Sequence, residues 1–221
     1  MIPLSAVVGR WYLCDDGWLG ELTLSELSDG QVEGVFFSDR FDDEYEVVVE
    51  IGGELGHEIT LAVQDFNWLP EQRFVGRLFT GGAAGIAGAS DWRGTPYGFF
   101  AARSPWTVLG DYRPGDVVPE DFAGSWNAQL DGTSATLRLD LAGDGRTLTG
   151  TCVGRGLPEG LRVSATPDAE FPHRLALTVT ADDRRPWATL DCLLNSRPKN
   201  AMSGTMITDE GSRGFYLIRY A

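Results

Sequence analysis

The residues that most often carry catalysis or bind metals are few in this chain and lie far apart. The only two histidines, His57 and His173, are 116 positions apart, and neither has a serine or cysteine at a spacing that suggests a catalytic pair. The three cysteines, Cys14, Cys152 and Cys192, show no CxxC or CxxH spacing, which argues against a zinc site and against a disulfide framework. We expect structural or surface roles for the histidines and buried free thiols for the cysteines.

Two further runs have the composition of binding loops but not their spacing. The acidic residues between Asp39 and Glu44 lack the spaced oxygen ligands and the fixed glycine of a calcium loop, so we expect a solvated loop there. The glycine-rich residues 81–88 contain no GKS or GKT sequence, so they indicate a turn followed by a strand rather than a phosphate-binding loop. The sequence therefore predicts no metal and no cofactor.

The elements that position any site belong to an internal duplication. Residues 9–11 (GRW) recur as residues 124–126 (GSW) at a shift of 115. Residues 57–63 align with residues 173–179 at a shift of 116. Self-similarity of this kind predicts that the same structural unit is built twice.

The duplication also predicts how the chain divides. We expect a first domain at 1–103 and a second at 122–221, joined by a linker at 104–121 that is rich in proline and glycine and matches neither copy. Within the copies, Gly76 aligns best with Gly204, at a shift of 128. That match predicts compensating differences in loop length between the copies.

Hydrophobic residues alternate with polar or small ones throughout each copy, as in residues 45–51 and 59–63, which is typical of half-buried strands. Turn sequences such as those at 28–30 and 143–145 separate about eight such runs per copy, and no segment indicates a helix longer than one turn. Eight short antiparallel strands hide their edges when the first strand pairs with the last. The predicted fold class is all-β: two tandem antiparallel eight-stranded barrels that form a pseudo-dimer.

The ends of each copy resemble the calycin superfamily, which includes the lipocalins and the avidin-like proteins. That superfamily shows a GxW sequence on the first strand and an arginine on the last strand that packs across the tryptophan. The resemblance implies calycin-like barrels in which Trp11 pairs with Arg103 and Trp126 with Arg219. A guanidinium group over an indole ring contributes about 0.5–2 kcal/mol, depending on desolvation.

Aromatic residues are concentrated in the first copy. Residues 1–103 hold 15 of the 24 aromatic side chains, whereas residues 122–221 hold 7. The narrow interior of an eight-stranded barrel cannot enclose them all, so we expect some to line a ligand pocket. The alternative is that outward aromatic residues bury the contact between the barrels or a homodimer face. The predicted ligand-binding residues are Tyr45, Trp68, Phe74, Trp92 and Phe99.

Three functions follow from this architecture, and the residues leave open whether the protein is an enzyme. The leading prediction is binding of a small apolar or aromatic molecule in the first barrel. The first alternative is a cyclase or isomerase that shapes a flexible apolar substrate without metal or cofactor, an idea that the resemblance supplies because some natural-product cyclases use such barrels. The second alternative is a protein-interaction module with filled barrels.

Charge narrows the range of partners. The chain carries a formal net charge of −14, so nucleic acid and anionic membrane surfaces are poor partners. No apolar run approaches the roughly 18 residues of a membrane span, and the start of the chain lacks the features of a signal peptide. We therefore expect a cytoplasmic protein whose partner is a small apolar molecule.

Overall fold

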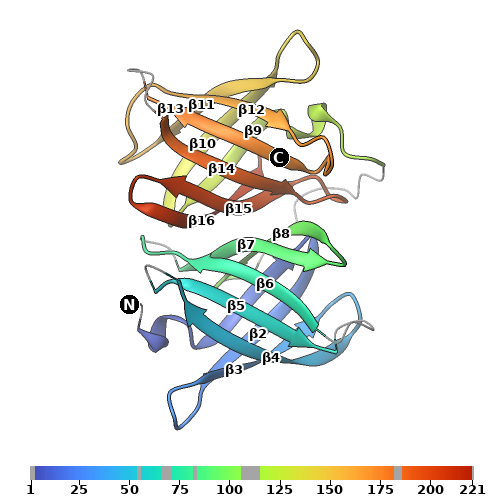
Figure 1. The fold of residues 1–221 in the computed structure, drawn as a ribbon, viewed down its shortest axis with the longest axis vertical. Coiled ribbons are helices and arrows are strands. Elements are labelled where there is room, and N and C mark those ends of the chain that lie inside the picture. Colours follow the sequence, from blue (N-terminus) through green and yellow to red (C-terminus); the bar gives the residue numbers. More distant parts are fainter. Residues whose placement is uncertain are drawn as a thin grey trace.

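The computed structural model describes residues 3–53, 56–65, 71–81, 84–105, 115–181 and 186–220. This part of the chain forms two closed antiparallel barrels of eight strands each (Figure 1). The first barrel consists of β1 (Gly9–Asp15), β2 (Trp18–Glu26), β3 (Val32–Ser38), β4 (Asp43–Gly52), β5 (Glu58–Gln64), β6 (Glu71–Leu78), β7 (Gly85–Trp92) and β8 (Thr95–Ala102). The second consists of β9 (Gly124–Leu130), β10 (Thr133–Leu141), β11 (Leu148–Gly154), β12 (Leu161–Pro167), β13 (Arg174–Thr180), β14 (Pro186–Leu194), β15 (Ala201–Thr208) and β16 (Gly211–Arg219).

The predicted all-β class and the two tandem eight-stranded barrels are confirmed. Consecutive strands pair in order, and each barrel closes where β1 pairs with β8 and β9 pairs with β16. Closure gives every strand a partner on both sides, so neither barrel has an open edge. The other regular elements in the described ranges are two short 3-10 turns, η1 (Leu4–Ala6) and η3 (Pro119–Phe122). No helix in the same ranges is long and apolar enough to cross a membrane.

The strand register fixes which residues of the two copies are equivalent. The first two strands are related by a shift of 115, and the strands from β3 and β11 onward by a shift of 116. In the first barrel, Gly76 of β6 pairs with Gly88 of the neighbouring strand β7. In the second barrel, Cys192 of β14 pairs with Gly204 of β15. Gly204 is therefore equivalent to Gly88, and the predicted pairing of Gly76 with Gly204 is wrong. A match between two single glycines does not determine which residues of the two copies are equivalent, whereas the register of the paired strands does.

Each barrel is closed at one end by the predicted tryptophan and arginine. The guanidinium carbon of Arg103 lies 3.6 Å from the Trp11 ring centroid, and that of Arg219 lies 4.2 Å from the Trp126 ring centroid. Both indoles are almost completely buried. Each indole N–H also donates to a backbone carbonyl four residues upstream, at 2.7 Å and 3.0 Å. The contact that the sequence predicts is thus present twice.

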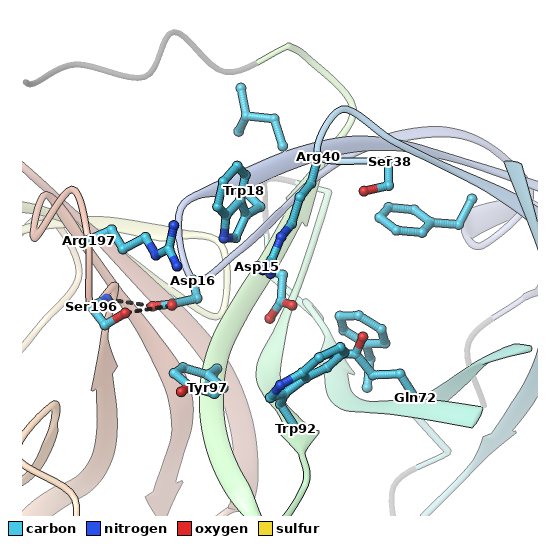
Figure 2. A pocket seen from close by; sticks show the side chains of 13 residues that line it. Asp15, Asp16, Trp18, Ser38, Arg40, Gln72, Trp92, Tyr97, Ser196 and Arg197 are labelled. Atoms are coloured by element: carbon cyan, nitrogen blue, oxygen red, sulfur yellow. Dashed lines mark hydrogen bonds between the residues drawn. The ribbon is translucent and has the colours of Figure 1, made fainter. Parts of the chain in front are cut away.

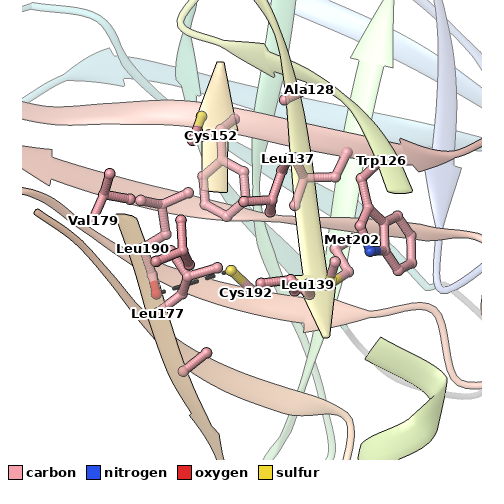
Figure 3. Packing of buried hydrophobic residues seen from close by; sticks show 14 of the residues in the cluster. Trp126, Ala128, Leu137, Leu139, Cys152, Leu177, Val179, Leu190, Cys192 and Met202 are labelled. Carbon is pink, nitrogen blue, oxygen red and sulfur yellow. Dashed lines mark hydrogen bonds between the residues drawn. The ribbon is translucent and has the colours of Figure 1, made fainter. Parts of the chain in front are cut away.

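The second barrel has a continuous apolar interior (Figure 3). Leu137, Leu139, Leu177 and Met202 belong with the closing Trp126 to one cluster of buried side chains. The three cysteines of the chain are free and buried, as predicted.

The barrels meet along a seam formed by β6, β7 and β8 of the first and β14, β15 and β16 of the second. Both histidines lie in this seam. Nε2 of His57 lies 2.9 Å from the Ser212 carbonyl oxygen, and Nε2 of His173 lies 2.6 Å from the Pro96 carbonyl oxygen. Because a carbonyl only accepts, each ring donates through Nε2. Both the donors and the acceptors are 116 positions apart, so the seam has pseudo-twofold symmetry.

A second pair of polar contacts obeys the same symmetry. The Asp16 carboxylate accepts hydrogen bonds from the backbone N–H and the hydroxyl of Ser196. The equivalent Asp131 accepts the same two bonds from Thr80. At the same seam, the Tyr216 ring of the second barrel stacks on Phe79 and Phe100 of the first. Two of the additional aromatic residues of the first copy, Phe79 and Phe100, therefore pack in the contact between the barrels.

Candidate functional site

A cavity of about 170 Å³ opens at the mouth of the first barrel, beside the seam (Figure 2). It lies at the end of β1 opposite to Trp11, and the second barrel contributes Ser196 and Arg197 to its wall. An engineered apolar cavity of about 150 Å³ holds a benzene molecule, so this volume suits one aromatic ring. The cavity is therefore the candidate binding site.

Aromatic side chains supply much of the wall. Phe36 and Phe74 line the cavity from β3 and β6, with ring centroids 6.4 Å apart. Trp92 and Tyr97 line it from β7 and β8, which a tight turn connects. Strands place these rings inward because alternate residues face the barrel interior.

A tight hairpin between β1 and β2 positions Asp15 and Trp18 at the cavity. Asp16 and Gly17 have φ values of 47° and 84°, the positive values that a two-residue type I′ turn requires at both positions. The turn makes Asp15 and Trp18 direct partners across β1 and β2. A carboxylate and an indole are thus held side by side at the mouth.

Position by position, the polar groups inside the first barrel have apolar counterparts in the second. The equivalence follows from the pairs Asp15 with Phe99, Val63 with Gln72 and Phe74 with Ser90, which the second barrel repeats at shifts of 115 and 116. The replacements are Asp15 by Leu130, Gln72 by Ala188 and Ser90 by Met206. All three counterparts belong to the apolar core of the second barrel. Among the described residues, the first barrel therefore has polar side chains beside a cavity at these positions, where the second has apolar ones.

Asp15 is a titratable group in this polar cluster. The Ser90 hydroxyl donates to its Oδ1 at 2.6 Å. Burial raises the pKa of Asp15 to about 7, and the neighbouring Asp16 charge adds to this, whereas the Ser90 and Gln72 hydrogen bonds and the Arg40 charge act in the opposite direction. The carboxyl group is thus poised to exchange a proton near neutral pH.

Gln72 provides an unsatisfied acceptor at the same depth. Its side chain is 2% exposed, and its Oε1 has no hydrogen-bond partner in the described structure. A buried acceptor without a partner costs about 1–3 kcal/mol. A hydrogen-bond donor brought into the cavity would offset this cost.

Two arginines form the rim of the cavity. Figure 2 shows Trp18 between Arg40 of the first barrel and Arg197 of the second. Their guanidinium carbons lie 4.6 Å and 5.0 Å from the centroid of the indole ring. Within the described ranges, neither guanidinium has a carboxylate at ion-pair distance. The rim therefore presents two positive charges held against one ring.

The five predicted ligand-binding residues have different locations. Phe74 and Trp92 line the cavity. Phe99 is fully buried behind Phe74, with the two rings edge to face at 5.3 Å, and it does not line the cavity. Tyr45 packs partly buried against the first core and is likewise not among the lining residues. Trp68 lies outside the described residues.

The sequence prediction missed the polar part of the site, namely Asp15, Gln72, Arg40 and Arg197. Counting aromatic residues can identify side chains that line a cavity, but it does not identify the polar groups that orient a ligand. The available signal was the comparison of inward positions between the copies, which exposes Asp15 and Gln72 as polar exceptions. No group of three or more histidine, cysteine or acidic side chains in the described residues is arranged to hold a metal ion.

Comparison with known proteins yields a likeness to a solved structure. No protein-family model matches the chain, and no curated protein matches it either. The solved structure of a protein of unknown function from the DUF3598 family of Nostoc punctiforme PCC 73102 is similar over 97% of this chain and 95% of that chain, with 13% sequence identity and a TM-score of 0.32.

Proposed function

We propose that the protein binds a small molecule with a single aromatic ring in the mouth of the first barrel. The observation that carries this proposal is the contrast between the barrels: the first has a cavity of about 170 Å³ with aromatic walls, and the second has apolar side chains at the equivalent inward positions. A void lined by a few polar groups is typical of a ligand site. The same contrast disfavours an interaction module with two filled barrels.

The ring would lie among Phe36, Phe74 and Trp92, where burial of its apolar surface contributes roughly 25 cal/mol per Å² before the cost of association. Deeper polar groups, Asp15 and Gln72, would orient a hydrogen-bonding substituent. The second barrel would act as a scaffold that supplies part of the rim.

Isothermal titration with benzyl alcohol, a neutral single-ring probe, tests the proposal. We expect measurable binding to the intact chain, and about tenfold weaker binding for Trp92→Ala, because Trp92 lines the cavity. Trp187→Ala is the matched control, since Trp187 packs against the second core and leaves the cavity untouched. Equal losses in both variants, or no binding of any single-ring probe to the intact chain, would contradict the proposal.

The closing tryptophan–arginine pairs support a finer proposal about ancestry. We propose that each barrel is calycin-like, because the GxW tryptophan and the terminal arginine contact each other in both copies. A related calycin structure should then superpose these two side chains as well as the strands.

A second candidate function is supported by Asp15. A carboxyl group whose pKa burial raises to about 7, set in an aromatic cavity, is suited to general acid–base catalysis of an isomerisation. Acetophenone in deuterated water tests this. If Asp15 removes a proton from the methyl carbon and returns a deuteron to the enolate, exchange of the methyl protons will be visible by NMR and lost in Asp15→Asn. Exchange at the uncatalysed rate would exclude this chemistry for a single-ring ketone.

A further inference from the structure

We infer that the ligand of this site is a small aromatic carboxylate, with its ring in the cavity and its anionic group at the rim, in the positive field of Arg40 and Arg197. The inference rests on the proposed function and names its ligand class.

The way the two arginines are held supports an anionic ligand. A guanidinium group stacked on an aromatic ring keeps its N–H donors directed outward in its own plane, where they match the two oxygens of a carboxylate. The guanidinium carbons of Arg40 and Arg197 lie over the Trp18 ring, 4.6 Å and 5.0 Å from its centroid. Trp18 thus fixes two donor groups before a ligand arrives, which reduces the entropy that binding must overcome.

Arg40 and Arg197 form no ion pair with a described carboxylate, although the chain is acidic. There are 32 aspartate and glutamate residues against 18 lysine and arginine residues. Six arginines in the described ranges form ion pairs, among them Arg174 with Asp191 at 2.7 Å and Arg77 with Glu58 at 2.9 Å. Two arginines that lie at a cavity mouth without such a partner leave their positive charge available to a ligand.

The nearby acidic groups do not neutralise this charge fully. Both oxygens of Asp16 already accept hydrogen bonds from Ser196. Burial opposes the ionisation of Asp15, so its carboxyl group is only partly charged near neutral pH. With Asp16 counted as a full negative charge and Asp15 as a partial one, the two guanidinium charges still exceed the carboxylate charge at the rim, so an anion there is attracted although the whole chain is negative.

Both barrels contribute to this recognition. Arg197 follows Ser196, the residue that Asp16 of the first barrel holds through two hydrogen bonds. The contact that docks the barrels thus also places the second guanidinium over Trp18. A ligand carboxylate at this rim would be attracted by charged groups from both halves of the chain.

Isothermal titration of the full chain with three isosteric probes tests the inference: benzoate, neutral benzamide and cationic benzamidine. We expect benzoate to bind at least about tenfold more tightly than benzamide, and its affinity to fall with added salt. Arg197→Gln and Arg40→Gln should each weaken benzoate about tenfold and change benzamide by less than about twofold. Arg138→Gln, which removes an exposed arginine of the second barrel, is the control and should change neither.

The outcomes separate the two proposals. Benzamide or benzamidine binding as tightly as benzoate would overturn the carboxylate inference while leaving a ring-binding site. Loss of all three probes to the same extent in Arg197→Gln would also overturn it, because the arginine would then shape the cavity rather than bind an anion. Failure of every probe and of benzyl alcohol to bind the intact chain would overturn the proposed function itself.

Discussion

Replacing Asp15 by asparagine should stabilise the protein in a pH-dependent way. In the folded state burial raises the pKa of Asp15 from its ordinary value of 3.8 to about 7. Between these two pH values the folded protein holds a proton that the unfolded chain has released, so the wild type loses stability as pH rises and the loss is complete above about pH 7. Asparagine keeps the shape and a hydrogen-bonding group but cannot ionise.

The magnitude follows from the pKa difference. A difference of about three pH units corresponds to about 4 kcal/mol of unfolding free energy at pH 8, at about 1.4 kcal/mol per unit. This is an upper bound, because the Asp15 side chain is half-buried and the cavity opens to solvent. Between about pH 5.5 and about pH 8, the stability of Asp15→Asn relative to the wild type should therefore increase by up to about 2 kcal/mol.

Urea unfolding, followed by tryptophan fluorescence at several pH values in this range, measures the effect. The quantity to compare is the difference between variant and wild type, since ionisations common to both cancel. Asp140→Asn, which removes an exposed carboxylate of the second barrel, controls for the loss of one negative charge from an acidic chain. A constant difference between Asp15→Asn and the wild type across the range would refute the reasoning, because it would mean that Asp15 titrates alike when folded and unfolded.

Three further predictions concern the scaffold. Trp126→Ala should lower the unfolding free energy by about 3–5 kcal/mol in urea titrations, since its indole is completely buried, and a change below about 1 kcal/mol would contradict its closing role. Gly98→Ala should lower it by about 1–3 kcal/mol, because a Cβ there would lie 2.5 Å from a serine hydroxyl and 2.7 Å from a carbonyl oxygen of the other barrel, whereas Gly143→Ala, with open space around it, should be neutral. Fragments 1–105 and 119–221, expressed separately, should each show β-rich circular dichroism and a cooperative melt; if neither does so, even when mixed, the barrels are not independent folding units.

The scaffold could be predicted because its signals are local or repeated. Alternation along each strand reports burial on one face, and the matched tryptophan and arginine at the ends of both copies indicate closure. Trp11 on the first strand and Arg103 after the last contact each other because barrel closure brings these two strands together. The same closure explains why an equivalent pair occurs in the second copy.

The site could not be predicted in the same way, because its groups meet only after closure and docking. Asp15 precedes an Asp-Gly turn and has the local sequence of an exposed hairpin. Its hydrogen-bond donor, Ser90, is 75 positions away in the sequence. Arg197 reaches the rim only because the second barrel docks through Ser196. Because the sequence comparison aligns Gly76 with Gly204, it does not show that Ser90 of the first copy is equivalent to Met206 of the second. The strand register shows this equivalence.

Because the two halves of the pseudo-twofold seam belong to one chain, equivalent positions in them can carry different residues. In a dimer of identical chains, every substitution at such an interface appears on both sides at once. Here Tyr97 and Arg213 occupy equivalent positions; Arg213 pairs with Asp131, whereas Tyr97 stacks on His173 and lines the cavity. A covalent connection also gives the halves an effective concentration in the millimolar range, so a seam that would hold separate chains only weakly stays closed. One half can thus lose symmetry-related contacts and acquire a site without the halves coming apart.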